Sequence, residues 1–174
     1  MTVSPSRRQV SAVLLAAGAS QRMKSRKQLL EIEGEPMVRR AVKTVLAAEF
    51  VSLTVAVATG DWEVEVAIQD LPVTIASVRN PLLGQSESIR AGLEKTATTG
   101  CDGILFLPCD LPLLTAQHLN ALIALYQESE SQIVASKYDD IIGTPLIVDK
   151  SLWYEVRKLQ GDVGIRKIAS KYTD

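Results

Sequence analysis

Residues 10–30 read VSAVLLAAGASQRMKSRKQLL, and the order of residue types along this stretch predicts the fold. Residues 10–16 are apolar except for Ser11, as expected of a strand that is buried on both faces of a sheet. Small residues follow the strand, and four cations then lie within the six residues from Arg22 to Lys27. We therefore expect a buried strand whose following loop binds a ligand.

The rest of the chain alternates strand-like and helix-like patterns. Short apolar runs predict further strands over residues 53–58, 73–78, 103–107, 132–136 and 142–148. Helical periodicity lies between and after them, over residues 36–46, 61–68, 85–97, 115–126, 152–159 and 164–172. Pro36 is expected at the first helical position, with Asp61 and Thr115 as helix caps. This alternation predicts an α/β fold with a doubly wound, mostly parallel sheet, whose ligands bind in the loops that follow strands.

Length and composition narrow the class of protein. The chain has 174 residues, enough for one domain, and 47% of them are hydrophobic, which excludes a disordered chain. The net charge of −1 argues against a protein that coats nucleic acid or an anionic membrane. With two cysteines and one histidine, a disulfide scaffold, a zinc site and a His-based triad are not expected. No apolar run approaches the ~20 residues of a membrane span and no signal peptide is recognised, so we expect a cytoplasmic protein.

The loop after the first strand supports two interpretations. The small residues Ala16, Ala17 and Gly18 let backbone N–H groups approach an anion, and the cations that follow would neutralise it. Alternatively, the segment is a solvated basic turn with a packing glycine. Neither the GxGxxG nor the GxxxxGK[ST] fingerprint is present, which argues against a Rossmann-type oxidoreductase and against a P-loop protein.

The stretch LAAGASQRMKSRKQLL, residues 15–30, resembles the signature LAAGxSxRMGxxKxLL of the MobA-like nucleotidyltransferases, and it is most similar to the molybdenum cofactor cytidylyltransferases among them. The resemblance implies a Rossmann-like fold of the glycosyltransferase-A type. It implies that Arg22 and Lys27 are catalytic and bind phosphates, while the nucleotide is wrapped by Leu15, Ala16, Ala17 and Gly18. Lys24 replaces a glycine of the signature. Guanylyltransferase relatives usually carry LAGG and a DKG-like segment, so LAAG and Lys27-Gln28-Leu29 favour cytidine.

The loop after the third strand, residues 80–93, reads NPLLGQSESIRAGL. A glycine and two serines before a helix form a helix N-terminus that can bind a base, a ribose or a phosphate, or they simply cap the helix. The segment resembles the family pattern GxxxS[LIV]RxGL. The resemblance implies that Asn80, Gly84 and Ser88 hold the base and ribose.

Asp110 follows the buried run of residues 103–107, where the carboxyl edge of an α/β sheet is expected. A carboxylate there suits Mg²⁺, although a turn residue or a helix cap would also fit this position. The resemblance implies that Asp110 is a catalytic residue and the metal ligand. Cys109 is expected to be a small buried residue rather than a nucleophile, and His118 to be structural or exposed.

Two segments near the C-terminus also resemble the family. Gly143-Thr144-Pro145 resembles its GHP segment, with a threonine in place of the histidine, which puts an identical pterin substrate in doubt. Residues 161–166, GDVGIR, resemble its GDxGAR segment. Asp162 is either a second ligand of the metal or a cap of the last helix, and Arg166 is expected to bind a phosphate of the acceptor.

Taken together, the resemblance implies Mg²⁺-dependent transfer of a nucleoside monophosphate from CTP, or another NTP, to a phosphorylated acceptor such as Mo-molybdopterin, with release of pyrophosphate. Within one domain, 1–174, residues 1–110 would bind the nucleotide and residues 111–174 the acceptor. A molybdoenzyme or its chaperone would be a further partner, without nucleic acid or membrane. The alternatives are a guanylyltransferase for the same cofactor, a sugar-phosphate or polyol-phosphate nucleotidyltransferase, and a non-catalytic nucleotide- or cofactor-binding protein on the same fold.

Overall fold

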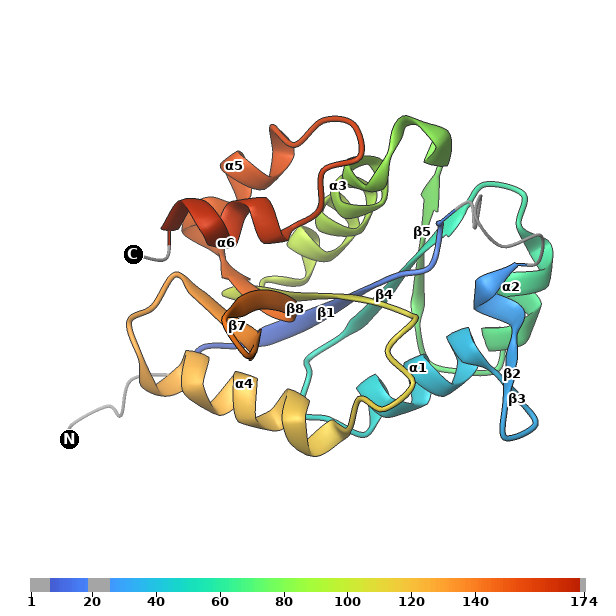
Figure 1. Ribbon diagram of the computed structural model, residues 1–174, viewed down its shortest axis with the longest axis horizontal. Coiled ribbons are helices and arrows are strands. Elements are labelled where there is room, and N and C mark those ends of the chain that lie inside the picture. The colour runs from blue at the N-terminus through green and yellow to red at the C-terminus, as the bar shows by residue number, and fades with distance from the viewer. Residues whose placement is uncertain (1–6, 19–25, 173–174) are drawn as a thin grey trace.

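A computed structural model describes residues 7–18 and 26–172, which contain a six-stranded sheet of order β5-β4-β1-β6-β8-β7 (Figure 1). Its parallel part consists of β1 (Val10–Leu15), β4 (Leu53–Ala58), β5 (Thr74–Val78) and β6 (Gly103–Pro108). The remaining strands, β7 (Ile133–Tyr138) and β8 (Ile141–Asp149), form an antiparallel hairpin, and β8 pairs antiparallel with β6. The predicted doubly wound, mostly parallel sheet is confirmed, and the predicted strand ends are correct to within two residues.

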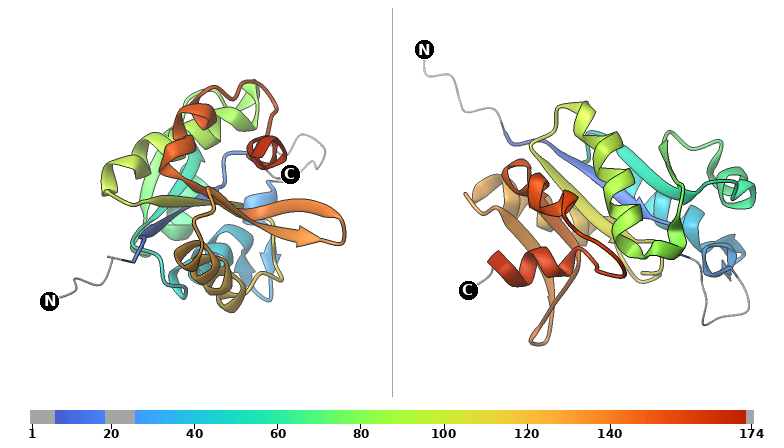
Figure 2. Two further views of the ribbon diagram at one scale, coloured as in Figure 1. Left: turned by 90° about the vertical axis from the view of Figure 1, so that its left-hand side faces the viewer. Right: turned by 90° about the horizontal axis from the view of Figure 1, so that it is seen from above.

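Helices cover both faces of the sheet (Figure 2). One face is covered by α1 (Met37–Leu46), α2 (Trp62–Ile68) and α4 (Ala116–Glu128), and the other by α3 (Gln85–Thr96), α5 (Trp153–Arg157) and α6 (Arg166–Tyr172). Because successive side chains of a strand point to opposite faces, Leu14 of β1 joins the first apolar core and Val13 the second. This explains why residues 10–15 are buried throughout.

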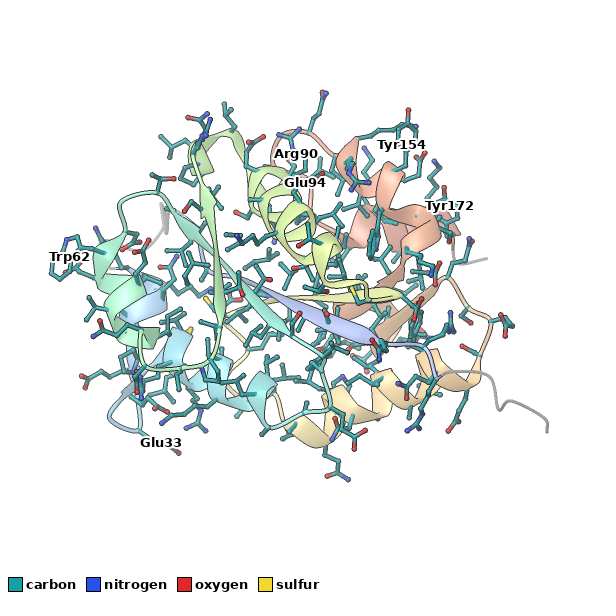
Figure 3. All side chains as sticks on the ribbon, turned by 180° about the vertical axis from the view of Figure 1, so that it is seen from behind. Glu33, Trp62, Arg90, Glu94, Tyr154 and Tyr172 are labelled. Atoms are coloured by element: carbon teal, nitrogen blue, oxygen red, sulfur yellow. The ribbon has the colours of Figure 1, made fainter. Side chains whose placement is uncertain are left out.

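Short elements connect these helices and strands. The 3₁₀ turns are η1 (Lys27–Leu29), η2 (Pro81–Leu83), η3 (Ala97–Thr99) and η4 (Lys150–Leu152), and β2 (Glu31–Ile32) pairs with β3 (Glu35–Pro36) in a small hairpin. None of the helices in the described part of the chain has the length and apolar character needed to cross a bilayer. Some large apolar side chains stay exposed, Trp62 on α2 and Tyr154 on α5 among them (Figure 3).

The predicted helix starts are correct in part. Thr115 caps α4, since its hydroxyl accepts a hydrogen bond from the His118 N–H at 3.2 Å. Pro36 is the N-cap of α1 rather than its first helical residue, because it pairs with Glu31 in the β2–β3 hairpin. Asp61 lies at the N-cap position of α2 but makes no capping hydrogen bond, since its carboxylate accepts one from Arg26 instead.

The order of the strands positions the loops that matter for function. The chain leaves β1 for β4 on one side and later returns to β6 on the other side, so β1 and β6 flank the topological switch point of the sheet. The Cys109 N–H donates to the Leu15 carbonyl at 3.2 Å, which fixes the ends of these two strands beside each other. Ligands of open α/β sheets bind in the crevice at such a point.

Candidate active site

An ion pair spans the switch point. Lys27 lies in η1, which follows β1, and its ammonium group pairs with the carboxylate of Asp110, which follows β6. The two side chains are 41% and 32% exposed, so both can be reached by a ligand. Asp110 does not cap α4, because that helix begins after Thr115. The structure thus brings together the two described residues for which the sequence predicted catalytic roles.

Gln28 fixes the start of the loop that follows β1. Its buried side-chain amide donates to the Ala16 carbonyl at 3.0 Å and to the Gly18 carbonyl at 2.6 Å. With both carbonyls held, the chain turns out of the sheet at Ala17 in a defined conformation. Arg22 and Lys24, which belong to the same loop, lie outside the described residues.

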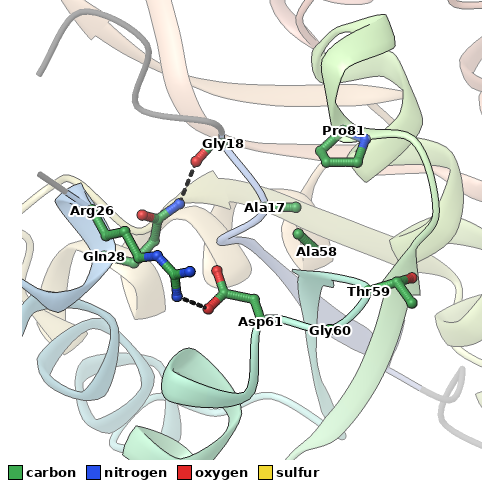
Figure 4. Close-up of a pocket in the computed structure, with 9 residues that line it drawn as sticks. All are labelled: Ala17, Gly18, Arg26, Gln28, Ala58, Thr59, Gly60, Asp61 and Pro81. Atoms are coloured by element: carbon green, nitrogen blue, oxygen red, sulfur yellow. Dashed lines mark hydrogen bonds and ion pairs between the residues drawn. The ribbon is translucent and has the colours of Figure 1, made fainter. Parts of the chain in front are cut away.

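A pocket of about 230 Å³ lies at the carboxyl ends of β1 and β4 (Figure 4). Most of the residues in its wall have small side chains, which leaves room for a flat ligand. One end is charged: Arg26 donates to Asp61 at 2.6 Å and also pairs with Glu63. The residues that line the pocket are Ala17, Gly18, Arg26, Gln28, Ala58, Thr59, Gly60, Asp61 and Pro81.

The first turn of α3 packs directly on the loop of residues 161–164. Gly84, the N-cap of α3, has a φ of +111°, and a Cβ built on it would lie 2.2 Å from the carbonyl carbon of Gly161. The Ser86 N–H also donates to the Gly161 carbonyl, at 3.3 Å. Two segments that the sequence singled out separately therefore form one surface at the carboxyl edge.

The serines of α3 do not cap it. Gly84 occupies the N-cap position, and no side chain there makes a capping hydrogen bond. Ser86 and Ser88 are both buried, and the Ser86 hydroxyl has no hydrogen-bond partner among the described residues. The alternative of plain helix capping by these serines is therefore wrong.

The remaining predicted residues lie around this edge. Leu15, Ala16 and Ala17 are buried, whereas Gly18 and Asn80 are exposed. Asp162 and Arg166 are exposed as well, on the loop and at the first position of α6. Since α6 begins at Arg166, the alternative that Asp162 caps it is wrong.

Neither Cys109 nor His118 presents a reactive side-chain group to the site. Burial, together with the smaller effect of the neighbouring Asp110 carboxylate, raises the pKa of the Cys109 thiol to about 12, so this cysteine is a buried, unreactive residue as predicted. His118 lies within 2.8 Å of the Ser136 hydroxyl, which itself donates to the Pro145 carbonyl at 2.9 Å. The histidine ring nitrogen is thus engaged in a structural contact.

Comparison with known families identifies the fold. The model of the MobA-like NTP transferase domain matches residues 12–174. The chain belongs to this family. Its mostly parallel sheet is accordingly the fold of a nucleotidyltransferase.

Two curated relatives of this MobA-like transferase carry different names. Purine catabolism protein PucB of Bacillus subtilis is 31% identical over 163 residues, which cover 90% of this chain and 78% of PucB. A probable molybdenum cofactor guanylyltransferase of Rhodopirellula baltica is 30% identical over 131 residues, which cover 74% of this chain and 61% of that protein.

Solved structures share the fold. Rv0371c of Mycobacterium tuberculosis H37Rv superimposes with a TM-score of 0.81 at 24% identity, covering 92% of this chain and 82% of that one. Its complex with manganese gives a TM-score of 0.79 at 23% identity, covering 93% and 82%. CMP:2-keto-3-deoxy-manno-octonic acid synthetase complexed with CTP superimposes with a TM-score of 0.67 at 15% identity. The match covers 94% of this chain and 82% of that one.

Sequence reasoning missed one loop of the MobA-like site. Residues 59–61 follow the predicted strand 53–58, and loops after strands were expected to bind ligands, yet Thr59, Gly60 and Asp61 match no motif used for the resemblance. The roles of Gln28 and Arg26 depend on partners that are distant in the chain, so no local pattern predicts them.

Proposed function

We propose that this MobA-like transferase moves the nucleoside monophosphate of CTP onto the terminal phosphate of Mo-molybdopterin and releases pyrophosphate. The observation that carries the proposal is the Lys27–Asp110 pair at the switch point, beside a pocket with a wall of small residues. Family membership supports the reaction class. The LAAG sequence at residues 15–18, with Lys27-Gln28-Leu29, supports CTP as the donor. A molybdoenzyme or its chaperone would receive the product.

Residues 1–110 are proposed to bind the nucleotide. Backbone N–H groups of the loop from Leu15 to Gly18 would surround it, in the conformation that Gln28 holds through the Ala16 and Gly18 carbonyls. Asn80, Gly84 and Ser88 would contact base and ribose from the loop before α3 and from its first turn.

The carboxylates at this edge fit Mg²⁺. The described residues contain no cluster of three or more His, Cys, Asp or Glu side chains that could hold a metal. The protein is proposed to supply two carboxylates, those of Asp110 and Asp162. This suits Mg²⁺, which binds one or two carboxylates and takes its remaining ligands from water and substrate phosphates. When bound, Mg²⁺ would neutralise part of the negative charge of the phosphates. The manganese complex of Rv0371c supports a divalent metal in this family.

The chain's own residues would position the reacting groups and balance their charge, which is most of what nucleotidyl transfer requires. Lys27 would exchange its contact with Asp110 for a phosphate oxygen, and Arg22 would assist it. Asp162 and Arg166 lie in the acceptor-side part of residues 111–174. The Arg166 guanidinium would bind the acceptor phosphate directly, whereas the Asp162 carboxylate would act on it only as a ligand of Mg²⁺. That phosphate is ionised at neutral pH and needs no general base, in keeping with the engaged His118 and the unreactive Cys109.

A screen of nucleotides and acceptors tests the proposal. Among CTP, GTP, ATP and UTP with Mg²⁺, CTP is expected to raise the melting temperature most, because a ligand that binds only the native state stabilises it. Pyrophosphate release is then expected on addition of Mo-molybdopterin. A larger shift with GTP would instead support a guanylyltransferase, the activity named for the Rhodopirellula baltica relative. Tight CTP binding without turnover on any acceptor would support a non-catalytic binding protein.

Lys27→Ala is expected to weaken CTP binding while the chain stays folded. Hydrogen bonds to charged groups contribute about 1.5–3 kcal/mol, so the dissociation constant measured by titration calorimetry with Mg²⁺ should rise roughly tenfold to a hundredfold. Lys43→Ala is the matched control, because Lys43 also pairs with a carboxylate, that of Glu35, but lies on α1. Equal CTP affinities of the wild type and Lys27→Ala would contradict the role of Lys27.

A further inference from the structure

One carboxylate oxygen of Asp61 accepts a hydrogen bond from Arg26, and the other is directed at the pocket. Asp61 follows β4, and its Oδ1 accepts a hydrogen bond from Arg26 Nη1 at 2.6 Å. The other oxygen points toward the space between Gly18 and Ala58 (Figure 4). No hydrogen bond to that second oxygen is present within residues 7–18 and 26–172. The pocket therefore presents an open hydrogen-bond acceptor, the second oxygen of a carboxylate whose first oxygen pairs with Arg26.

The orientation of this carboxylate is fixed by Arg26, which lies at the charged end of the pocket. Arg26 Nη1 pairs at the same time with Glu63 in the first turn of α2, so Glu63 helps to hold the guanidinium group in place. The side chain of Asp61 is only 15% exposed. Since Gly60 and Ala58 bring no bulk beside it, a flat group can reach the open oxygen through the pocket.

Two of the other polar side chains that line the pocket, Gln28 and Arg26, are engaged, and the Thr59 hydroxyl lines the pocket as well. The Gln28 amide nitrogen donates to the Ala16 and Gly18 carbonyls, and Arg26 is held by its two carboxylates. A ligand that enters among Ala17, Ala58 and Pro81 thus meets an apolar wall and an anionic acceptor at one end. Such a wall accepts the faces of an aromatic ring, and the acceptor selects a ring that carries a hydrogen-bond donor on its edge.

We propose that Asp61 is a specificity-determining residue, which selects a nucleoside triphosphate by accepting a hydrogen bond from the exocyclic amino group of its base. The inference rests on the proposed function, in which the chain binds CTP, and adds that the amino edge of the base reaches this pocket, whose lining includes Pro81 next to Asn80. Cytosine presents an amino group where uracil presents a carbonyl oxygen, and aspartate accepts from the cytosine amino group in other recognition sites. A carboxylate cannot donate, so UTP would meet two acceptors face to face and be rejected.

Two variants separate this role from that of the Arg26 ion pairs. Asp61→Asn removes the charge at the pocket and keeps a good N-cap residue at the start of α2. Glu63→Gln removes the other carboxylate partner of Arg26, but Glu63 does not line the pocket. Both weaken the hold on Arg26, and only Asp61→Asn changes the group that faces the ligand.

The test is the ratio of CTP to UTP affinity, measured by titration calorimetry with Mg²⁺ on the full chain. The wild type is expected to prefer CTP, Asp61→Asn to lower the ratio roughly tenfold to a hundredfold, and Glu63→Gln to leave it unchanged. Circular dichroism checks that both variants are folded, and Asp61→Ser repeats the test if Asp61→Asn is not.

Four outcomes would overturn the inference. An unchanged ratio of CTP to UTP affinity in Asp61→Asn would overturn the inference and leave the proposed function standing. A wild type that prefers UTP would also overturn the inference. A fall of the same size in Glu63→Gln would show that only the Arg26 ion pairs matter. A wild-type chain that binds no nucleoside triphosphate would overturn the proposed function itself, and the inference with it.

Discussion

Asp110→Ala is expected to lower the rate of pyrophosphate release from CTP by about a hundredfold to a thousandfold, the cost of removing one group that balances charge in a transition state. The carboxylate is held at the switch point by Lys27, beside the proposed path of the triphosphate. Without it, the site keeps its cation but loses the oxygen ligands that Asp110 would offer to Mg²⁺. Binding of the metal should weaken together with turnover.

The fold should survive this substitution. Asp110 is partly exposed and caps no helix, and ion pairs that are open to solvent contribute only about 0–1 kcal/mol to stability. Urea unfolding of Asp110→Ala is therefore expected to stay close to that of the wild type. The structure thus predicts a large loss of activity without a large loss of stability.

A carboxylate elsewhere provides the matched control. Glu94 lies on α3 and accepts a hydrogen bond from Arg157 at 2.7 Å, in an exposed ion pair between α3 and α5 (Figure 3). Glu94→Ala removes one carboxylate of an ion pair, as Asp110→Ala does, and should leave pyrophosphate release unchanged. Undiminished turnover in Asp110→Ala would contradict the proposed metal ligand.

The parallel core of the fold could be predicted from the sequence because a buried strand requires a continuous run of apolar residues. Strands that are covered on both faces, such as β1 and β6, need continuous apolar runs, and these runs end where the strands end. The direction of β8 could not be predicted in this way, since the same apolar run is found in parallel and in antiparallel strands. The two-residue strands of the β2–β3 hairpin are too short for any period to be recognised.

The site was predictable where a loop directly follows a strand and carries a recognisable pattern. Lys27 and Asp110 belong to such loops, and the strand order explains why they meet. Gln28 and Asp61 owe their positions to partners on other elements, and these partners are known only once the chain is folded. The same holds for the contact between Gly84 and Gly161, which joins two motifs that the sequence left apart.

Gly84→Ala is expected to destabilise the chain strongly. The backbone of Gly84, with φ +111° and ψ 175°, lies in a region that only glycine occupies readily. A methyl group there would also lie 2.2 Å from the carbonyl carbon of Gly161 and 2.4 Å from the Asp162 nitrogen. Both neighbours are backbone atoms that cannot rotate away, so strain and steric overlap together should lower the free energy of unfolding by about 2–5 kcal/mol.

The size of the effect depends on what the new methyl group meets, and two other glycines separate the causes. Gly100 has a φ of +76° and open space around its Cβ position, so Gly100→Ala should cost only the backbone strain, about 1–2 kcal/mol. In Gly164→Ala the methyl group would lie 2.6 Å from the Gln85 side-chain oxygen, which can swing aside. Urea unfolding is expected to rank Gly84→Ala as clearly the least stable.

The same substitution should disturb the proposed site, because the chain can relieve the overlap only by moving the 161–164 loop or the start of α3. The loop carries Asp162 and the helix start carries Ser88, so either movement separates the groups proposed for acceptor and nucleotide. CTP affinity of the folded fraction should therefore fall in Gly84→Ala and stay unchanged in Gly100→Ala. Equal stability and equal CTP affinity of these two variants would show that the loop does not rest on α3 in solution.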